Sequence, residues 1–381
     1  MRRKICIVLT TRGNYAKMKS TMRAIEDDPK LELQTVVGGG ILLGRYGDYS
    51  KYIKRDGFAI AEHVPFLMAG DSLESMAMSA GMATFELSRT FARLRPDIVI
   101  VIADRYEALS VAHAAMCMNI AIAHLEGGEI SGSIDERIRH AITKLAQVHF
   151  PANLEAAERI RRMGEPGCMV IATGTPSLDL LAEVDLDDLS ALQEVLEQRG
   201  QGCRIDLSEN YLVVSQHPVV TENEAVEKQI ANTLSAVRSI GMPIVWILPN
   251  MDAGERSAAT VLAQQGADLH VRVVSSLPME HYARLLKHSC CLVGNSSSGI
   301  RECEYLGVPV VNIGSRQNGR QRGRNVIDVD HDVDAIIWAI KSQLDHGYYE
   351  SDHLYGDGTA GKRIAEALAS ISIGLDKRMT Y

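Results

Sequence analysis

Aromatic residues are scarce in this sequence, and none of its apolar runs is long. Phe, Trp and Tyr together make up 5% of the 381 residues, whereas glycine occurs 31 times. This composition disfavours an aromatic-rich β-sandwich and favours an α/β protein with many tight turns between strands and helices. No run approaches the ~20 apolar residues of a membrane-spanning helix. The short apolar run near the N-terminus predicts a buried strand rather than a signal peptide.

Paired cysteines and an excess of positive charge are missing as well. The seven cysteines form no CxxC pair and no Cys/His spacing typical of zinc. We therefore expect no metal site and a reducing, cytoplasmic setting. Lys and Arg total 40 against 48 Asp and Glu, which gives a net charge of −8. That balance argues against a nucleic-acid-binding protein.

The hydrophobic pattern predicts the same βαβ organisation in both halves of the chain. Continuous apolar runs are typical of strands in a parallel sheet that is covered on both faces. The predicted strands are Lys4–Thr10, Leu31–Gly38, Asp97–Ala103, Ile120–His124, Tyr211–Ser215, Pro243–Leu248, Leu269–Val274, Cys290–Gly294 and Pro309–Ile313. The predicted helices include Ser72–Leu94, Ala152–Met163, Glu222–Ile240, Arg256–Gln265, Met279–Lys287 and Gly299–Leu306. We expect an α/β fold with two facing, doubly wound Rossmann-like domains and a cleft between them.

The boundary between the two halves is expected in an acidic, then polar and glycine-rich stretch at 183–210. The first domain should span 1–183, and the second should span 184–359. A final helix within 360–381 has no strand after it, which makes it a candidate for packing back on the first domain.

Chemistry is expected where parallel strands end, because ligands of open α/β sheets bind at the carboxyl ends of the strands. The first strand is not followed by GxGxxG, and no Walker A motif occurs, so an ordinary NAD or P-loop site is excluded. Arg12 follows the first strand and suits an anion. Asp104 and Arg105 follow the most hydrophobic strand, although Asp104 could simply cap the next helix.

The densest polar stretch runs from His124 to His140 and contains four carboxylates, two histidines and three glycines. Ser133 and Glu136 have the spacing of a helix-capping box, but that box does not explain Glu126 or Asp135. Carboxylates that share a site repel each other, so one of them can become an acid or a base.

The second half places polar side chains at equivalent points. His217 and Asn250 follow two predicted strands, and Ser296 and Ser297 precede a helix whose N–H groups could cradle a diphosphate. Glu302 lies one turn along that helix, where a carboxylate can bind ribose hydroxyls. A loop that begins near Arg316 carries four arginines and provides local positive charge, unless it is simply a solvated, mobile loop.

Five motifs together resemble the hydrolysing UDP-N-acetylglucosamine 2-epimerases of sialic and legionaminic acid biosynthesis, which have the GT-B fold. The motifs are HLEGGEISGSIDERIRHAITKLA, SQHPV, LPNMDAG, GNSSSGIRE and GVPVVNIGSRQNGR. The resemblance implies removal of the C2 proton, anti-elimination of UDP to 2-acetamidoglucal, and addition of water to give N-acetylmannosamine. It also implies no cofactor, no membrane or nucleic-acid partner, and a homodimer or homotetramer.

The resemblance also assigns roles to residues of this chain. The implied catalytic residues are Asp104, Glu126, Asp135 and His217. The implied UDP-sugar ligands are Arg12, Arg105, His124, Asn250, Ser296, Ser297, Glu302 and Arg316. The family usually has an aspartate where this chain has Asn14 and a glycine where it has Ala103. An asparagine can accept a hydrogen bond but cannot act as a base.

Four alternatives stay open. The same chemistry could act on UDP-N,N′-diacetylbacillosamine, or the enzyme could be a non-hydrolysing 2-epimerase that keeps UDP on the product. A GT-B glycosyltransferase would require an acceptor and would not exchange the C2 proton. A nucleotide-sugar sensor would bind UDP without turnover, and the carboxylate cluster around Glu126 and Asp135 argues against it.

Overall fold

The chain folds into two α/β units, each built around a mainly parallel sheet. The structure is a computed structural model that describes residues 2–43, 49–70, 72–102, 104–131, 134–248, 270–275, 277–378 and 380. The first unit comprises Met1–Glu129, Asp135–Ala182 and Tyr355–Tyr381, and the second comprises Ile130–Ile134 and Glu183–Leu354. The first unit therefore contains both ends of the chain.

Within the described residues, the sheet of the first unit has six parallel strands in the order β3-β2-β1-β4-β5-β6. The strands are β1 (Arg3–Leu9), β2 (Leu31–Gly38), β3 (Ile60–Val64), β4 (Ile98–Ile102), β5 (Ala121–Leu125) and β6 (Val148–Phe150). Every residue of β4 and β5 is buried. The strand order reverses between β1 and β4, which is the arrangement of a doubly wound nucleotide-binding fold.

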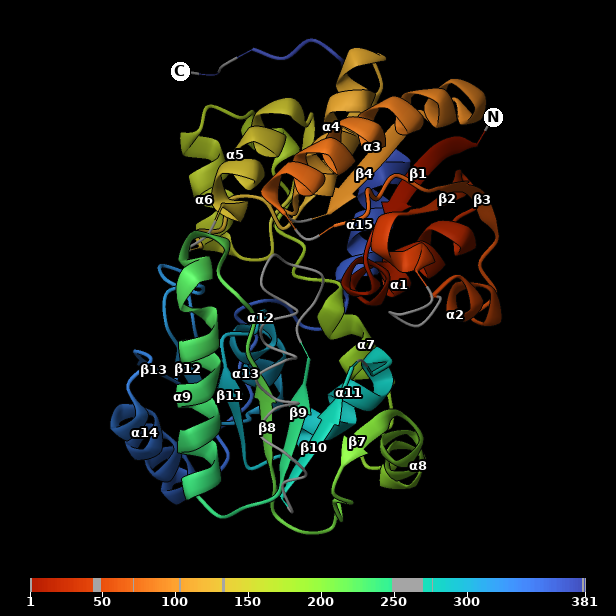
Figure 1. Cartoon of the computed structure of the whole chain (residues 1–381). Helices are drawn as coiled ribbons and strands as arrows, with labels where there is room; N and C mark the ends of the chain where they lie inside the picture. Colours follow the sequence, from red (N-terminus) through yellow and green to blue (C-terminus); the bar gives the residue numbers. More distant parts are fainter. Residues whose placement is uncertain are drawn as a thin grey trace. The chain divides into compact units, whose positions relative to one another are not determined.

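Alternate side chains of β1 enter two different cores, as the period of a strand requires. Ile5 and Ile7 pack in a core to which helices α1 (Arg12–Asp27) and α15 (Ala360–Ser370) contribute. Cys6 and Val8 pack in a second core with α3 (Leu73–Leu94), α4 (Tyr106–Cys117) and α5 (Asp135–Leu145) (Figure 1). Helices on both faces explain why the strand sequences are continuously apolar.

Helix α15 is fixed to the first unit by a buried carboxylate. Asp179 on α7 (Ser177–Glu183) accepts hydrogen bonds from the N–H groups of Ala360 at 2.9 Å and Gly361 at 2.6 Å. A Cβ atom at Gly361 would lie 2.7 Å from the backbone nitrogen of Thr21. Glycine therefore allows α15 to approach the backbone of α1 closely.

The sheet of the second unit has the order β13-β12-β11-β8-β9-β10-β7 among the described residues. Its strands are β7 (Gly200–Gly202), β8 (Leu212–Ser215), β9 (Ile244–Ile247), β10 (Val271–Val274), β11 (Cys291–Gly294), β12 (Val310–Ile313) and β13 (Val326–Val329). The edge strand β7 is antiparallel to β10, and the other pairs are parallel. If β7 is left out and the remaining strands are taken from β10 to β13, their spatial order β10-β9-β8-β11-β12-β13 corresponds to β3-β2-β1-β4-β5-β6 of the first unit.

Helices α9 (Val226–Ser239) and α14 (Val333–His346) pack in one core with β8, β9 and β11, and they lie side by side in Figure 1. The remaining helices in the described parts of the chain are α2 (Tyr49–Arg55), α6 (Leu154–Arg162), α8 (Leu189–Arg199), α11 (Met279–Lys287), α12 (Ser297–Ile300) and α13 (Glu302–Leu306). Short 3-10 segments occur at Gly39–Leu42, Gly167–Met169 and Val220–Ala225.

The predicted α/β class and the two Rossmann-like sheets are confirmed, but the sequence pattern missed β3, β6, β7 and β13. These strands have only three to five residues, and β7 (Gly200–Gly202) has no apolar side chain. The single helix predicted at Gly299–Leu306 is wrong, because the chain breaks at Arg301 into α12 and α13. The predicted helix Arg256–Gln265 lies outside the described residues.

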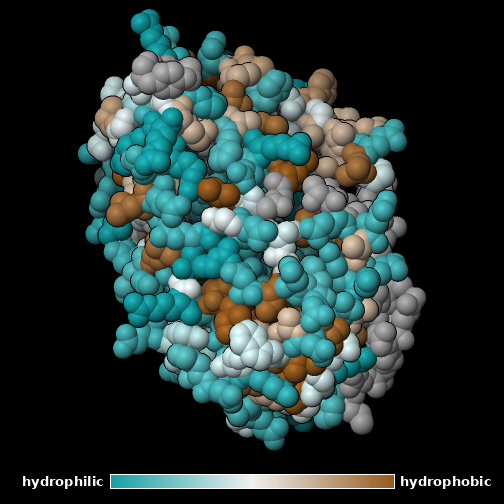
Figure 2. Space-filling model, turned by 90° about the vertical axis from the view of Figure 1, so that its left-hand side faces the viewer, coloured by the Kyte–Doolittle hydropathy of each residue, from teal (hydrophilic) through white to brown (hydrophobic). Residues whose placement is uncertain are grey.

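No helix in the described part of the chain is both long enough and apolar enough to cross a membrane. Figure 2 shows a face on which hydrophilic residues predominate and hydrophobic ones occur in small groups.

Candidate active site

In each sheet, the strand order reverses between two neighbouring strands, β1 and β4 in the first unit and β8 and β11 in the second. The loops that follow such a pair run in opposite directions and leave room for a ligand at the carboxyl ends of the strands. Those residues predicted from sequence that the structure describes lie at the two reversal points or in the segments beside them. Each unit therefore provides candidate site residues of its own.

The turn after β1 is held by a reciprocal hydrogen-bond pattern. Thr11 is the N-cap of α1, and its hydroxyl accepts from the Asn14 N–H at 3.2 Å. The side-chain oxygen of Asn14 accepts from the Thr10 hydroxyl at 2.9 Å and from the Thr11 N–H at 3.1 Å. An amide oxygen thus makes the contacts that an aspartate oxygen would make in a capping box. Arg12 begins α1, and its side chain lies outside the described part of the structure.

Glu126, directly after β5, is buried and has an unusual backbone conformation. Its φ of 58° lies in the left-handed region that non-glycine residues seldom adopt. Its carboxylate accepts hydrogen bonds from Lys17 Nζ at 2.8 Å and from the Thr175 hydroxyl at 2.6 Å, and the residue is only 1% exposed. Strain of this kind persists where the surroundings fix it, and it is concentrated at functional sites.

Asp104 follows β4 and pairs with Arg139 of α5. The structure places Arg105, rather than Asp104, at the N-cap of α4, so the alternative that Asp104 caps this helix is wrong. Arg139 is 1% exposed and also donates to the backbone oxygen of Glu129 at 2.9 Å. Arg105 itself pairs with Glu107, with 3.2 Å between Nε and Oε2.

Helix α5 carries the predicted site residue Asp135 and also contacts the predicted site residue His124. Asp135 is its first residue and is partly exposed. Thr143 lies two turns further on and places its hydroxyl 3.1 Å from Nδ1 of His124. The His124 ring is fully buried in β5, and a Cβ at Gly127 would lie 2.8 Å from it. Ser133 lies outside the described residues, so the predicted capping box stays a prediction.

In the second unit, Asn295 joins the ends of three neighbouring strands. Its side chain accepts from the His217 N–H at 2.6 Å and donates to the His217 oxygen at 2.9 Å. Its backbone oxygen accepts from Arg316 at 3.0 Å and from Gln317 at 2.8 Å. We call these contacts of Asn295 with His217, Arg316 and Gln317 the Asn295 clasp. It fixes the backbone of His217 after β8 and the side chain of Arg316 after β12.

The serine-rich segment continues from this clasp. Ser296 is the N-cap of α12 and accepts from the Ser298 N–H at 3.3 Å, and Ser297 begins the helix. Glu302 begins α13, is 4% exposed, and its Oε2 has no hydrogen-bond partner among the described residues. A buried carboxylate oxygen in this state suits a hydroxyl donor from a ligand. Asn250 lies outside the described residues.

Two arginines of the arginine-rich loop after β12 are hydrogen-bonded rather than freely solvated. Arg320 is 8% exposed and donates to the side-chain oxygen of Gln317 at 2.8 Å. Arg322 pairs with Asp328 and donates to the backbone oxygen of Gln317 at 2.6 Å. The loop therefore holds its positive charge in place.

Lys17, Arg139, Thr175 and Asn295 were not assigned roles from the sequence, although they contact predicted site residues. Lys17 and Glu126 are 109 positions apart, and Arg139 and Asp104 are 35 apart. Lys17 lies on the helix that begins at Arg12, and Arg139 and Asn295 lie within two of the quoted motifs, but these positions do not reveal their partners.

A model of the UDP-N-acetylglucosamine 2-epimerase family matches residues 23–369. The chain is 33% identical to the hydrolysing UDP-N,N′-diacetylbacillosamine 2-epimerase of Legionella pneumophila, over 98% of this chain and 97% of that protein. It is 33% identical to a UDP-N-acetylglucosamine 2-epimerase of Neisseria meningitidis, over 97% and 95%. A solved structure of the N. meningitidis UDP-GlcNAc 2-epimerase bound to UDP-GlcNAc has a TM-score of 0.79, with 16% identity and coverage of 96% and 99%. The structural likeness confirms the predicted GT-B fold.

Replacing Asn295 by alanine should destabilise the protein, because the backbone N–H and oxygen of His217 would lose their partners. We expect a loss of about 1–3 kcal/mol in the free energy of unfolding, measured by urea denaturation. Asn210→Ala, at an exposed position before β8, is the control and should change little. Equal stability of the two variants would contradict the role of the clasp.

Glu304 on α13 should make stability depend on pH. Burial, with a smaller contribution from the charge of Asp352, raises the pKa of Glu304 from 4.5 to about 8. The unfolded carboxyl loses its proton near its ordinary pKa, whereas the folded one keeps it, so Glu304 costs stability increasingly as pH rises from 4.5 to about 8.

Glu304→Gln should therefore stabilise the protein more at pH 8 than at pH 5 when melting temperatures are compared with the unmodified chain. Glu350→Gln, at an exposed position in the same unit, should show no such trend. A gain that is the same at both pH values would refute the buried, protonated carboxyl.

Proposed function

Because the chain belongs to the UDP-N-acetylglucosamine 2-epimerase family, we propose that it is a hydrolysing 2-epimerase that converts UDP-N-acetylglucosamine and water into N-acetylmannosamine and UDP. The observation that carries this proposal is the arrangement of charges after β4 and β5. Asp104 is paired with Arg139, and the buried, strained Glu126 is paired with Lys17.

The proposed reaction has two steps. A carboxylate takes the proton from C2 of the sugar while the C1–O bond to UDP breaks, and a C1–C2 double bond forms in 2-acetamidoglucal. Water then adds its hydroxyl to C1, and a proton returns to C2 from the opposite face. The first step requires a base near C2 and stabilisation of the departing diphosphate near C1.

Asp104, Glu126 and Asp135 form the proposed acid/base set. A cation beside a carboxylate favours its ionised form, which is the form that can accept a proton. Lys17 and Arg139 have the proposed task of orienting Glu126 and Asp104. Thr175 restricts Glu126 further, because its hydroxyl occupies the second carboxylate oxygen.

The second unit is proposed to hold the nucleotide. Arg316 and the hydroxyls of Ser296 and Ser297 would contact the diphosphate, and Glu302 would accept hydrogen bonds from the ribose. His217 would support the leaving phosphate. Fixed positive charge at the leaving group lowers the barrier because it does not have to reorganise during the reaction. The Asn295 clasp supports this proposal, since it holds Arg316 beside the backbone of His217.

A second candidate substrate is UDP-N,N′-diacetylbacillosamine, which the name of the L. pneumophila relative favours. The two sugars differ in their substituents away from C1 and C2, so the same chemistry would serve both. A non-hydrolysing 2-epimerase would also use the C2 proton but would keep UDP on its product.

Proton NMR in deuterated water, with each of the two UDP-sugars, tests the proposed function. We expect free UDP and N-acetylmannosamine that carries deuterium at C2. UDP-N-acetylmannosamine as the product would assign the non-hydrolysing reaction instead. Turnover of UDP-N,N′-diacetylbacillosamine alone would identify that sugar as the substrate. The absence of C2 exchange with both sugars would rule out 2-epimerase chemistry.

Glu126→Gln should lower kcat by about 10²–10⁴-fold, because the amide cannot accept the proton. UDP binding, measured by calorimetry, should stay close to that of the unmodified protein, since Glu126 is not among the residues proposed to contact UDP. Glu155→Gln makes the same change at an exposed site on α6 and should be fully active. Full activity of the Glu126 variant would exclude it from the acid/base set.

A further inference from the structure

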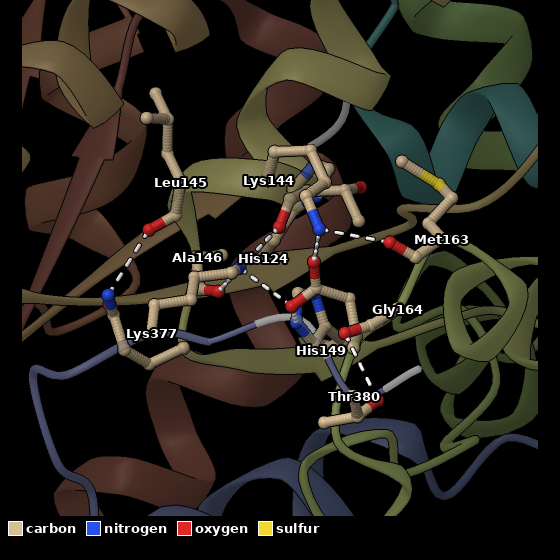
Figure 3. Close-up of polar contacts among 12 residues, drawn as sticks. His124, Lys144, Leu145, Ala146, His149, Met163, Gly164, Lys377 and Thr380 are labelled. Atoms are coloured by element: carbon tan, nitrogen blue, oxygen red, sulfur yellow. Dashed lines mark hydrogen bonds and ion pairs between the residues drawn. The ribbon is translucent and has the colours of Figure 1, made fainter.

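Lys377, in the segment after α15, is part of a charged cluster in the first unit. Lys377 Nζ contacts three acceptors, namely Glu165 Oε2 at 2.7 Å, the backbone oxygen of Thr143 at 2.9 Å and the backbone oxygen of Ala146. Figure 3 shows Lys377 among Lys144, Ala146 and His149. A lysine ammonium has three N–H donors, so the three acceptors match its full capacity.

Glu165 is the centre of this cluster and is only 1% exposed. Besides Lys377, its carboxylate accepts from Lys144 Nζ at 2.6 Å and lies 3.2 Å from Nε2 of His149. Burial alone would raise the pKa of Glu165, but the hydrogen bonds from His149, Lys144 and Lys377 outweigh burial and lower the pKa to about 2. Glu165 is therefore ionised at neutral pH and holds the Lys377 ammonium in place.

Of the two backbone oxygens that Lys377 contacts, that of Thr143 lies in the last turn of α5 and that of Ala146 directly follows the helix. The last four carbonyl groups of a helix have no partner within the helix. A lysine at this end supplies hydrogen bonds and opposes the negative end of the helix dipole. Here the cap comes from a residue 231 positions further along the chain, so the final segment and α5 are directly connected.

Helix α5 supports much of the candidate site in the first unit. Asp135 begins it, Arg139 pairs with Asp104, and the Thr143 hydroxyl lies 3.1 Å from His124. These three residues of α5 are four positions apart, which places them on one face of the helix. Thr143 is shared, because its hydroxyl contacts His124 while its backbone oxygen contacts Lys377.

We propose that Lys377 is a positioning residue, which caps α5 from the C-terminal segment and thereby fixes Arg139 and Thr143 against Asp104 and His124. The effect on turnover rests on the proposed function, whereas the effect on α5 does not.

Thr380 also attaches the C-terminal segment to the first unit, so the effect of Lys377 on α5 can be distinguished from simple attachment of this segment. Thr380 donates from both its N–H and its hydroxyl to the backbone oxygen of Gly164, each at 3.2 Å. The final segment is therefore held at Gly164 independently of Lys377. Loss of the lysine ammonium removes the cap of α5 without removing this contact.

Lys377→Met and Arg378→Met provide a matched pair, since both remove one positive charge from the same segment. Position 378 is exposed, and Lys377 is partly buried. Hydrogen exchange of the amides at 139–146 and steady-state kinetics are measured on both variants. For Lys377→Met we expect faster exchange at 139–146 and a fall in kcat of about tenfold or more with little change in KM, because small displacements of reacting groups are costly. Arg378→Met should match the unmodified protein in both measurements.

Lys144→Met separates capping from the charge of Glu165. Lys144 contacts Glu165 and the backbone oxygen of Met163, but it does not contact the two backbone oxygens that Lys377 caps. It should therefore affect exchange at 139–146 and kcat less than Lys377→Met. Equal effects of the two variants would assign the result to the charge of Glu165 and overturn the capping role.

Unchanged exchange at 139–146 in Lys377→Met would overturn the proposal, and so would faster exchange with unchanged kcat. If this variant does not fold, Lys377→Gln decides, because an uncharged amide has only two N–H donors for the three acceptors. Exchange and kcat of Lys377→Gln equal to those of the unmodified protein would then contradict the proposal. If the unmodified protein has no 2-epimerase activity, the proposed function fails, and the exchange measurement alone decides the role of Lys377.

Discussion

The parallel sheet imposes the constraint on which the rest of each unit depends. A strand that is covered on both faces, such as β4, can present polar groups to a ligand only after it ends. The described candidate residues mostly follow this rule, since Asp104 comes after β4, Glu126 after β5 and His217 after β8. His124 is the exception, because it lies within β5 and is fully buried. Its contact with Thr143 shows how a polar group inside the sheet is satisfied by a helix packed against it.

This arrangement buries charged side chains, which is unfavourable unless they are paired. In the first unit, buried charged side chains are paired with side chains of opposite charge. An isolated buried ion is strongly unfavourable, and removal of one partner leaves the other uncompensated. Glu126 is paired with Lys17, Arg139 with Asp104, and Glu165 with Lys144 and Lys377. Two of these pairings involve α5, through Arg139 and Lys144. The helix is therefore held at the site end by Arg139 and at its other end by the cluster around Glu165.

The sequence was sufficient to predict the α/β class, the main strands and the turns that carry Asp104, Glu126, His217 and Ser296, because these depend on hydrophobic runs and on the polar residues directly after each run. It was not sufficient for the short strands β6 and β7, whose few residues provide no periodic pattern. Nor could it identify Lys17, Arg139 or Asn295 as partners of site residues. Their contacts join positions that lie far apart in the chain, and neither composition nor local spacing contains information on such pairs. The connection between Lys377 and α5 is the extreme case.

Asn14 makes the hydrogen bonds of the helix cap but lacks the negative charge that an aspartate would have at this position. The family resemblance leads us to expect an aspartate here, and the structure shows the asparagine oxygen accepting from Thr10 and Thr11 in the turn that begins α1. The capping box is therefore complete with an asparagine at this position. The substitution removes one negative charge from the first turn of the helix that also carries Lys17. An asparagine at position 14 therefore keeps the hydrogen bonds of the capping box but lacks the charge of a carboxylate.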